Sequence, residues 1–128
     1  MESARRMMDA DTASAALGIE LTELGAGRAV CRMEVTERMI NGHALCHGGY
    51  VFLLADTAFA CACNSHGPVT VAAGAEITFV APARMGDVLT AEAAERTRYG
   101  RSGIYDITVK KADGEVVAEF RGRSKEMR

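Results

Sequence analysis

Hydrophobic and polar residues alternate in two short stretches near the start of the chain, a pattern typical of β-strands. Residues 19–24 and 28–35 alternate on either side of Gly25-Ala26-Gly27, which predicts an antiparallel hairpin. The preceding residues 1–17 are rich in Ala, Met and Arg, and they predict a helical segment that Gly18 ends. A helical segment and two paired strands therefore open the chain.

A long apolar stretch follows the hairpin. Residues 47–64 contain no proline and no glycine after Gly49, and Ser65-His66-Gly67-Pro68 ends the stretch. This predicts a helix of about five turns. Because apolar side chains lie on nearly all sides of the helix, it must be enclosed, and we expect a sheet curled round it.

Strand patterns return after the helix in four segments, residues 69–81, 87–99, 103–111 and 115–125. The last three segments predict a meander, with Ala112-Asp113-Gly114 as its final turn. The predicted order is two strands, one buried helix and three or four further strands, which is an α+β fold. With 128 residues and no linker or internal repeat, we expect a single domain over residues 1–128.

Composition and charge narrow the classes of function. The chain is 48% apolar and 25% charged with a formal net charge of -2, so nothing in its charge favours binding of nucleic acid. No stretch reaches the roughly 20 apolar residues that a membrane helix needs, because Asp56 interrupts the most apolar segment. The first residues are charged and lack the apolar core of a signal peptide, so we expect a cytoplasmic protein.

The four cysteines, Cys31, Cys46, Cys61 and Cys63, raise the question of a disulfide framework or a metal site. Cys61 and Cys63 lie two positions apart on the predicted helix, where their side chains point about 200° apart and cannot share one ion. We expect buried free thiols, with no metal and no cofactor.

Asp56 is the only charged residue between His47 and Asn64. An unpartnered carboxylate on a buried helix is costly, so it must be paired, neutralised or used. We interpret Asp56 as a catalytic carboxylate. The alternative is that it caps N–H groups of a neighbouring strand or lies on a solvent-exposed stripe.

His47-Gly48-Gly49 begins the same helix, where backbone N–H groups lack intrahelical partners. Such donors can stabilise an oxyanion by about 3 kcal/mol each, although a plain glycine-rich helix start would look the same. We expect His47 to be a neutral orienting residue. Asn41 either directs its amide at the substrate or only makes the Asn41-Gly42 turn.

Gly48 and Asp56 cannot act on one carbonyl within a single chain. Eight residues of helix span about 12 Å, whereas a base or nucleophile must come within about 3 Å of its target. If both groups are catalytic, a second copy of the chain must bring its Asp56 to the first copy's Gly48. We therefore predict an obligate dimer with shared active sites.

The residues Asn41-Gly42-His43, Cys46-His47-Gly48-Gly49 and Leu54-Ala55-Asp56-Thr57-Ala58-Phe59-Ala60 resemble the PaaI-type thioesterases of phenylacetate catabolism. The resemblance runs from about Leu17 to Ser124. It implies a hotdog fold, a dimer with sheets joined edge to edge and a tetramer of two such dimers. It also implies hydrolysis of acyl-CoA thioesters such as phenylacetyl-CoA or its ring-hydroxylated analogues, with Asp56 as nucleophile or base, Gly48 as oxyanion donor and Asn41 assisting from the partner chain.

Two positions depart from the pattern of the wider superfamily. Some relatives carry a hydroxyl residue where this chain has Ala60 and Ala72, so Asn41, Thr57 or the backbone would have to hold the attacking water. We expect the substrate to contact Gly49, Tyr50, Thr57 and Phe59, and Phe52 is a further candidate. The CoA phosphates would draw on Arg84, Arg96, Arg98, Arg101, Arg121 or Arg123.

Two other functions fit the same residues. The chain could bind acyl-CoA without catalysis, with Asp56 only holding the interface. It could also be a hotdog hydratase or dehydratase that uses His47 together with a carboxylate. Release of free CoA distinguishes the first, and hydration of enoyl-CoA distinguishes the second.

Overall fold

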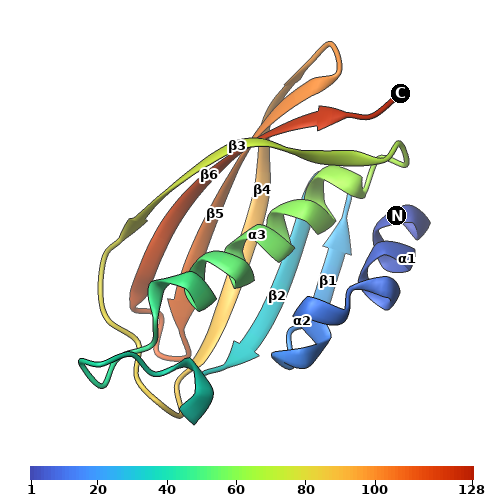
Figure 1. Cartoon of the computed structure of the whole chain (residues 1–128). Coiled ribbons are helices and arrows are strands. Elements are labelled where there is room, and N and C mark those ends of the chain that lie inside the picture. Colours follow the sequence, from blue (N-terminus) through green and yellow to red (C-terminus); the bar gives the residue numbers. More distant parts are fainter.

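The computed structural model describes residues 1–128, and it consists of one curved antiparallel sheet that encloses a central helix (Figure 1). The elements along the chain are α1 (Glu2–Ala10), α2 (Thr12–Ala16), β1 (Glu20–Gly25), β2 (Arg28–Glu34), the 3-10 helix η1 (Glu37–Met39), α3 (Gly48–Asn64), β3 (Thr70–Phe79), β4 (Val88–Tyr99), β5 (Ser102–Lys111) and β6 (Val116–Glu126). The predicted hairpin, central helix and four later strands are all confirmed.

The strands are ordered β1-β2-β4-β5-β6-β3 across the sheet. The predicted meander is confirmed, because β4 pairs with β5 and β5 with β6, all antiparallel. β3 does not pair with β4, which follows it in the chain. It pairs instead with β6, with Ile77 opposite Phe120, and so forms one edge of the sheet.

Helix α3 lies across the concave face of the sheet (Figure 1), where it contacts all six strands. Ten of its 17 residues are buried, which confirms that it is enclosed. Phe59 is 1% exposed and packs on Tyr105 and Phe120. Gly122 makes this approach possible, since a Cβ there would lie 2.7 Å from the Phe59 ring.

The N-terminal helical segment is two helices rather than one. The break falls at Asp11, whose carboxylate accepts a hydrogen bond from the Ser14 N–H at 2.9 Å and so caps α2. Ser14 is buried, and its hydroxyl meets the Thr57 hydroxyl of α3 at 2.9 Å. Helix α2 is therefore fixed against α3 one residue beyond Asp56.

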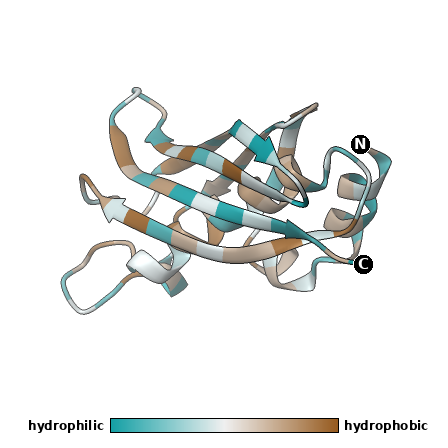
Figure 2. Ribbon diagram, turned by 90° about the horizontal axis from the view of Figure 1, so that it is seen from above, coloured by the Kyte–Doolittle hydropathy of each residue, from teal (hydrophilic) through white to brown (hydrophobic).

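The outer face of the sheet is polar. Hydrophilic and hydrophobic positions alternate along the strands (Figure 2), and the outward side chains form cross-strand ion pairs such as Lys110 with Glu92 and Arg123 with Glu76. None of the helices is both long enough and apolar enough to cross a membrane.

Candidate active site

The first half of the candidate site is the N-terminal end of α3. The Gly49 N–H donates to His47 Nδ1 at 2.9 Å, and the Tyr50 N–H donates to the His47 carbonyl at 3.0 Å. The Gly48 N–H has no hydrogen-bond partner within the chain. His47 thus acts as the helix cap through an unprotonated Nδ1, and Gly48 rather than Gly49 offers the free donor.

Asn41 makes the turn expected of it, and its contact with the substrate stays a prediction. Its Oδ1 accepts hydrogen bonds from the His43 N–H at 2.9 Å and the Leu45 N–H at 3.1 Å, which fixes the turn. The same side chain lines a cavity together with Gly48. Because the loop occupies the amide oxygen, the NH₂ group is the part left to donate to a ligand.

The cavity beside Gly48 has a volume of about 410 Å³ and is mainly apolar. Its lining residues are Asn41, Leu45, Cys46, Gly48, Val51, Phe79, Val80, Ala81, Pro82, Ala83 and Val117. A Cβ on Gly48 would lie 2.8 Å from the Phe79 ring, so glycine keeps the helix end close to this aromatic wall. Sequence reasoning missed the segment after β3, since a short apolar run carries no chemical signal.

The second half of the candidate site surrounds Asp56. Its cavity has a volume of about 240 Å³ and is lined by Met7, Asp56, Phe59, Ala60, Cys63, Thr70, Val71 and Ala72. Ala60 and Ala72, the two positions where the resemblance implies a hydroxyl residue in some relatives, both lie here. Sequence reasoning missed Met7 and Val71, because each reads as an ordinary apolar residue of its own element.

Asp56 is half-buried and makes no hydrogen bond or ion pair within the chain. Burial raises the pKa of its carboxyl, and the nearby Asp11 carboxylate raises it further. Asp56 caps no strand, so this structure lacks the capping role considered from the sequence. An unpartnered carboxylate in a mainly apolar hollow is the arrangement expected of a reactive group.

Of the expected substrate contacts, Thr57 and Tyr50 line neither cavity, whereas Phe59 borders the Asp56 cavity. The Thr57 hydroxyl donates to the Leu53 carbonyl at 2.9 Å and meets Ser14, away from the Asp56 cavity, so it is not free to hold water. Phe59 belongs to the core, although it also borders that cavity. Tyr50 lies edge-on to the His47 ring at 6.4 Å and lines neither cavity.

The two half-sites are separate within the chain. Gly48 and Asn41 line one cavity, Asp56 lines another, and no residue is shared between the two linings. This agrees with the spacing argument from the sequence, in which one chain cannot bring both groups to one carbonyl.

The cysteines do not form a competing site. All four cysteines are buried free thiols as expected, and burial raises the pKa of Cys46 to about 11 and that of Cys63 to about 12. No three His, Cys, Asp or Glu side chains converge as metal ligands would. Four of the six candidate arginines form ion pairs within the chain, while Arg84 and Arg101 form none.

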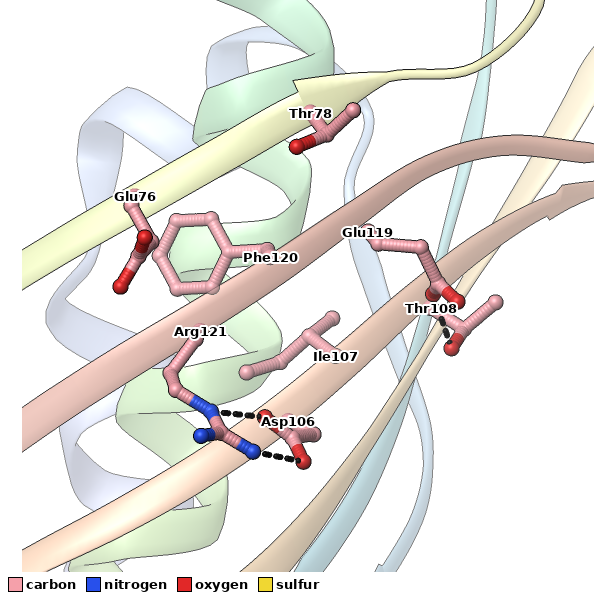
Figure 3. Close-up of a pocket in the computed structure, with 8 residues that line it drawn as sticks. All are labelled: Glu76, Thr78, Asp106, Ile107, Thr108, Glu119, Phe120 and Arg121. Carbon is pink, nitrogen blue, oxygen red and sulfur yellow. Dashed lines mark hydrogen bonds and ion pairs between the residues drawn. The ribbon is translucent and has the colours of Figure 1, made fainter.

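A larger hollow of about 530 Å³ lies on the outer face of the sheet, opposite α3 (Figure 3). Each of its charged side chains already has a partner, and Glu76 pairs with Arg123, which lies outside the hollow. Arg121 donates two hydrogen bonds to Asp106 at 2.7 and 2.8 Å and holds the pKa of that carboxyl below its usual range. Glu119 accepts a hydrogen bond from Thr108. This hollow therefore offers no unpartnered reactive group.

Comparison with known proteins identifies the family. The model of the thioesterase superfamily matches residues 43–118, which include Gly48 and Asp56. Acyl-coenzyme A thioesterase PaaI of Escherichia coli is 46% identical over 96% of this chain and 88% of that protein. The solved structure of the E. coli PaaI protein from the phenylacetic acid degradation operon covers 99% of this chain and 92% of its own, with a TM-score of 0.97 and 44% identity. Human acyl-coenzyme A thioesterase 13 is 30% identical over 80% of this chain and 76% of that protein. The chain therefore belongs to the thioesterase superfamily and has its hotdog fold.

Proposed function

We propose that this protein hydrolyses acyl-CoA thioesters at sites shared between two copies of the chain. The observation that carries the proposal is the position of the two half-sites relative to β3. Phe79, at the end of β3, borders the Gly48 cavity, whereas Thr70, Val71 and Ala72, at its start, border the Asp56 cavity. The half-sites therefore lie at opposite ends of one edge strand.

Strand β3 has the properties of an interface. Only one of its edges is paired, and its exposed residues include Val71 at 44% and Phe79 at 54%, with Val69 and Val80 just beyond its ends. A long apolar edge strand left open would invite aggregation unless another chain covers it. Antiparallel pairing of two β3 strands about a two-fold axis would cover both edges and continue the sheet.

The same pairing would complete the active site. In an antiparallel pair, the end of one strand lies beside the start of the other. The Gly48 cavity of one chain would then meet the Asp56 cavity of its partner, and the two-fold axis would repeat the contact. Each dimer would hold two complete sites, neither of which exists in one chain.

The chemistry follows from the groups brought together. The thioester carbonyl oxygen accepts a hydrogen bond from the Gly48 N–H, and the negative charge that develops on it is stabilised by the helix end. Asp56 of the partner chain attacks the carbonyl carbon or removes a proton from an attacking water. The C–S bond then breaks and CoA leaves as a thiolate, a good leaving group that needs no strong acid.

The two forms of the mechanism differ in where solvent oxygen goes. Direct attack by Asp56 gives a mixed anhydride, and hydrolysis of that anhydride at the aspartyl carbon leaves solvent oxygen in Asp56. General-base catalysis places solvent oxygen in the acid product alone. A single turnover in H₂¹⁸O, followed by mass spectrometry of the Asp56 peptide, distinguishes them.

For the substrate, we propose phenylacetyl-CoA or a ring-hydroxylated analogue. The similarity to E. coli PaaI over nearly the whole chain supports this choice. The Asp56 cavity also supports it, because a hollow of about 240 Å³ with mainly apolar walls suits a compact ring better than a long acyl chain.

Complementation between two inactive variants tests the shared site. Asp56→Asn removes the carboxylate and Gly48→Val fills the helix end, so each homodimer should be inactive on phenylacetyl-CoA. A dimer containing one chain of each kind has one intact site. Mixing the unfolded variants and refolding them together should restore about a quarter of wild-type activity, since half of the dimers are mixed and each has one working site of two. CoA release is followed with a thiol reagent, and no recovery in mixed dimers would contradict the proposal.

A further inference from the structure

One wall of the Asp56 cavity lies outside residues 43–118, the segment that matches the model of the thioesterase superfamily. Residues 43–118 supply seven of its lining residues, all from α3 and the first part of β3. The eighth is Met7 on helix α1. The shared part of the fold thus supplies the carboxylate and two walls, and α1 supplies a third wall.

Met7 is held in place from two directions. Helix α1 packs on α3, and its Ala4 is fully buried. Asn64 donates its two Nδ2 hydrogens to the carbonyls of Ala60 and Thr70, each at 2.9 Å, and the Met7 sulfur lies against the same nitrogen at 3.6 Å. Asn64 is 3% exposed and fixed at the junction of α3 and β3, so the thioether has a defined position.

Two of the other lining residues are small. Ala60 and Ala72 are alanines, and Phe59 presents an aromatic ring beside them. Small residues leave room for a flat group between helix and strand, and a thioether sulfur packs favourably on the edge of an aromatic ring. If Asp56 acts at the carbonyl as proposed, the acyl group of the substrate would extend into this same hollow.

From this geometry we infer that Met7 is the specificity-determining wall of the acyl pocket, and that it selects a single aromatic ring over larger acyl groups. The inference rests on the proposed function, since it assigns the acyl end of the same site. Met7 takes no part in the chemical step. Its removal changes which acyl group is accepted and leaves the catalytic groups intact.

The test compares Met7→Ala with Met8→Ala. Met8 is the same residue type on the same helix, is also partly buried and packs against the core, yet does not line the cavity. Values of kcat/KM are measured for phenylacetyl-CoA and 2-naphthylacetyl-CoA. Met7→Ala should raise the naphthylacetyl to phenylacetyl ratio by about tenfold, the size of effect that a few pocket atoms produce. Met8→Ala should leave the ratio at its wild-type value.

A third variant separates volume from stability. Met7→Leu keeps most of the side-chain volume, so it should retain the wild-type ratio. An unchanged ratio in Met7→Ala, or an equal change in Met8→Ala, would overturn the inference.

Binding measurements keep this result distinct from the proposed function. Thioether analogues, in which CH₂ replaces the thioester carbonyl, cannot be hydrolysed, and their dissociation constants can be measured by calorimetry on the same variants. If wild-type protein releases no CoA from thioesters, the proposed function fails, while a shift toward the naphthyl analogue in Met7→Ala alone still supports the wall. If the protein is an active thioesterase but Met7→Ala changes neither the ratio of kcat/KM values nor the ratio of dissociation constants, only the inference about Met7 is overturned.

Discussion

The two half-sites differ in how fully the chain satisfies its own polar groups. At the Gly48 end, His47 and Asn41 accept hydrogen bonds from the surrounding backbone, and the Gly48 N–H and the Asn41 NH₂ group are left free to donate. At the Asp56 end, an entire carboxylate lacks a partner. The first half-site is a preorganised set of neutral donors, and the second is a charge kept in an unfavourable place. The unpartnered Asp56 carboxylate therefore lowers the stability of the fold, whereas the hydrogen bonds around Gly48 order the start of the helix.

The largest effect should come from removing the charge at the second half-site. Asp56→Asn keeps the shape of the side chain but removes both the nucleophile and the base, so kcat should fall by on the order of 10²- to 10⁴-fold. CoA release under saturating phenylacetyl-CoA measures this, with sedimentation velocity to check that the oligomer is retained. Unchanged turnover would remove Asp56 from the mechanism.

The same variant should be more stable than wild type at neutral pH. The raised pKa means that the folded state binds a proton more tightly than the unfolded state does, so ionised Asp56 destabilises the fold above its folded-state pKa. As pH falls through that pKa toward the ordinary aspartate value, wild type regains this stability and the advantage of Asn disappears. Urea unfolding at several pH values measures the difference.

The next largest effect should come from Gly48, in the half-site that has no charged group. Gly48→Ala places a Cβ 2.8 Å from the Phe79 ring, which is exposed in the single chain and can swing aside, so the fold should survive. The displaced ring alters the aromatic wall of the cavity, and kcat/KM should fall by on the order of 10- to 100-fold. Gly42→Ala is the matched control, because a Cβ there meets nothing within 4 Å. Equal losses of kcat/KM in both variants would show that the close approach of Gly48 to the Phe79 ring does not matter for activity.

The sequence predicts most of what depends on local pattern and on single anomalies. The enclosed helix, the hairpin and the meander follow from periodicity, and Asp56 stands out because it is the one charge on an apolar helix. The prediction that a second chain is needed, if Gly48 and Asp56 are both catalytic, rests on helix geometry. These features can be predicted because each depends on residues that lie close together in the sequence.

Long-range placement could not be predicted in the same way. Nothing in the sequence of β3 indicates that it pairs with β6, and the wall formed by Met7 depends on how α1 packs 49 positions away from Asp56 along the chain. Thr57 is adjacent to Asp56 in sequence, yet it faces Ser14 because successive helical residues point about 100° apart. Strand pairing, helix packing and side-chain direction in the folded chain determine these placements.

The third prediction concerns the packing of Phe59, which borders the Asp56 cavity, and not the charge of Asp56. Gly122→Ala would place a Cβ 2.7 Å from the buried ring of Phe59, which has no room to move between Tyr105 and Phe120. Overpacking of this kind should lower the free energy of unfolding by about 1–3 kcal/mol, measured by urea denaturation. Gly25→Ala is the control, since its Cβ would meet nothing within 4 Å. A Gly122→Ala protein as stable as this control would show that the Phe59 wall is not tightly packed.

The smallest effect should come from Asp11, the second cause of the raised Asp56 pKa after burial. Asp11→Asn removes the charge while asparagine still caps α2. With the repulsion gone, the pKa of Asp56 should fall, and the acid limb of the kcat/KM profile should move to lower pH. The shift should be partial, because burial still raises the pKa. Asp9→Asn on exposed α1 surface is the control and should leave the limb in place. A limb that moves to higher pH in Asp11→Asn would show that the acid limb does not report ionisation of Asp56.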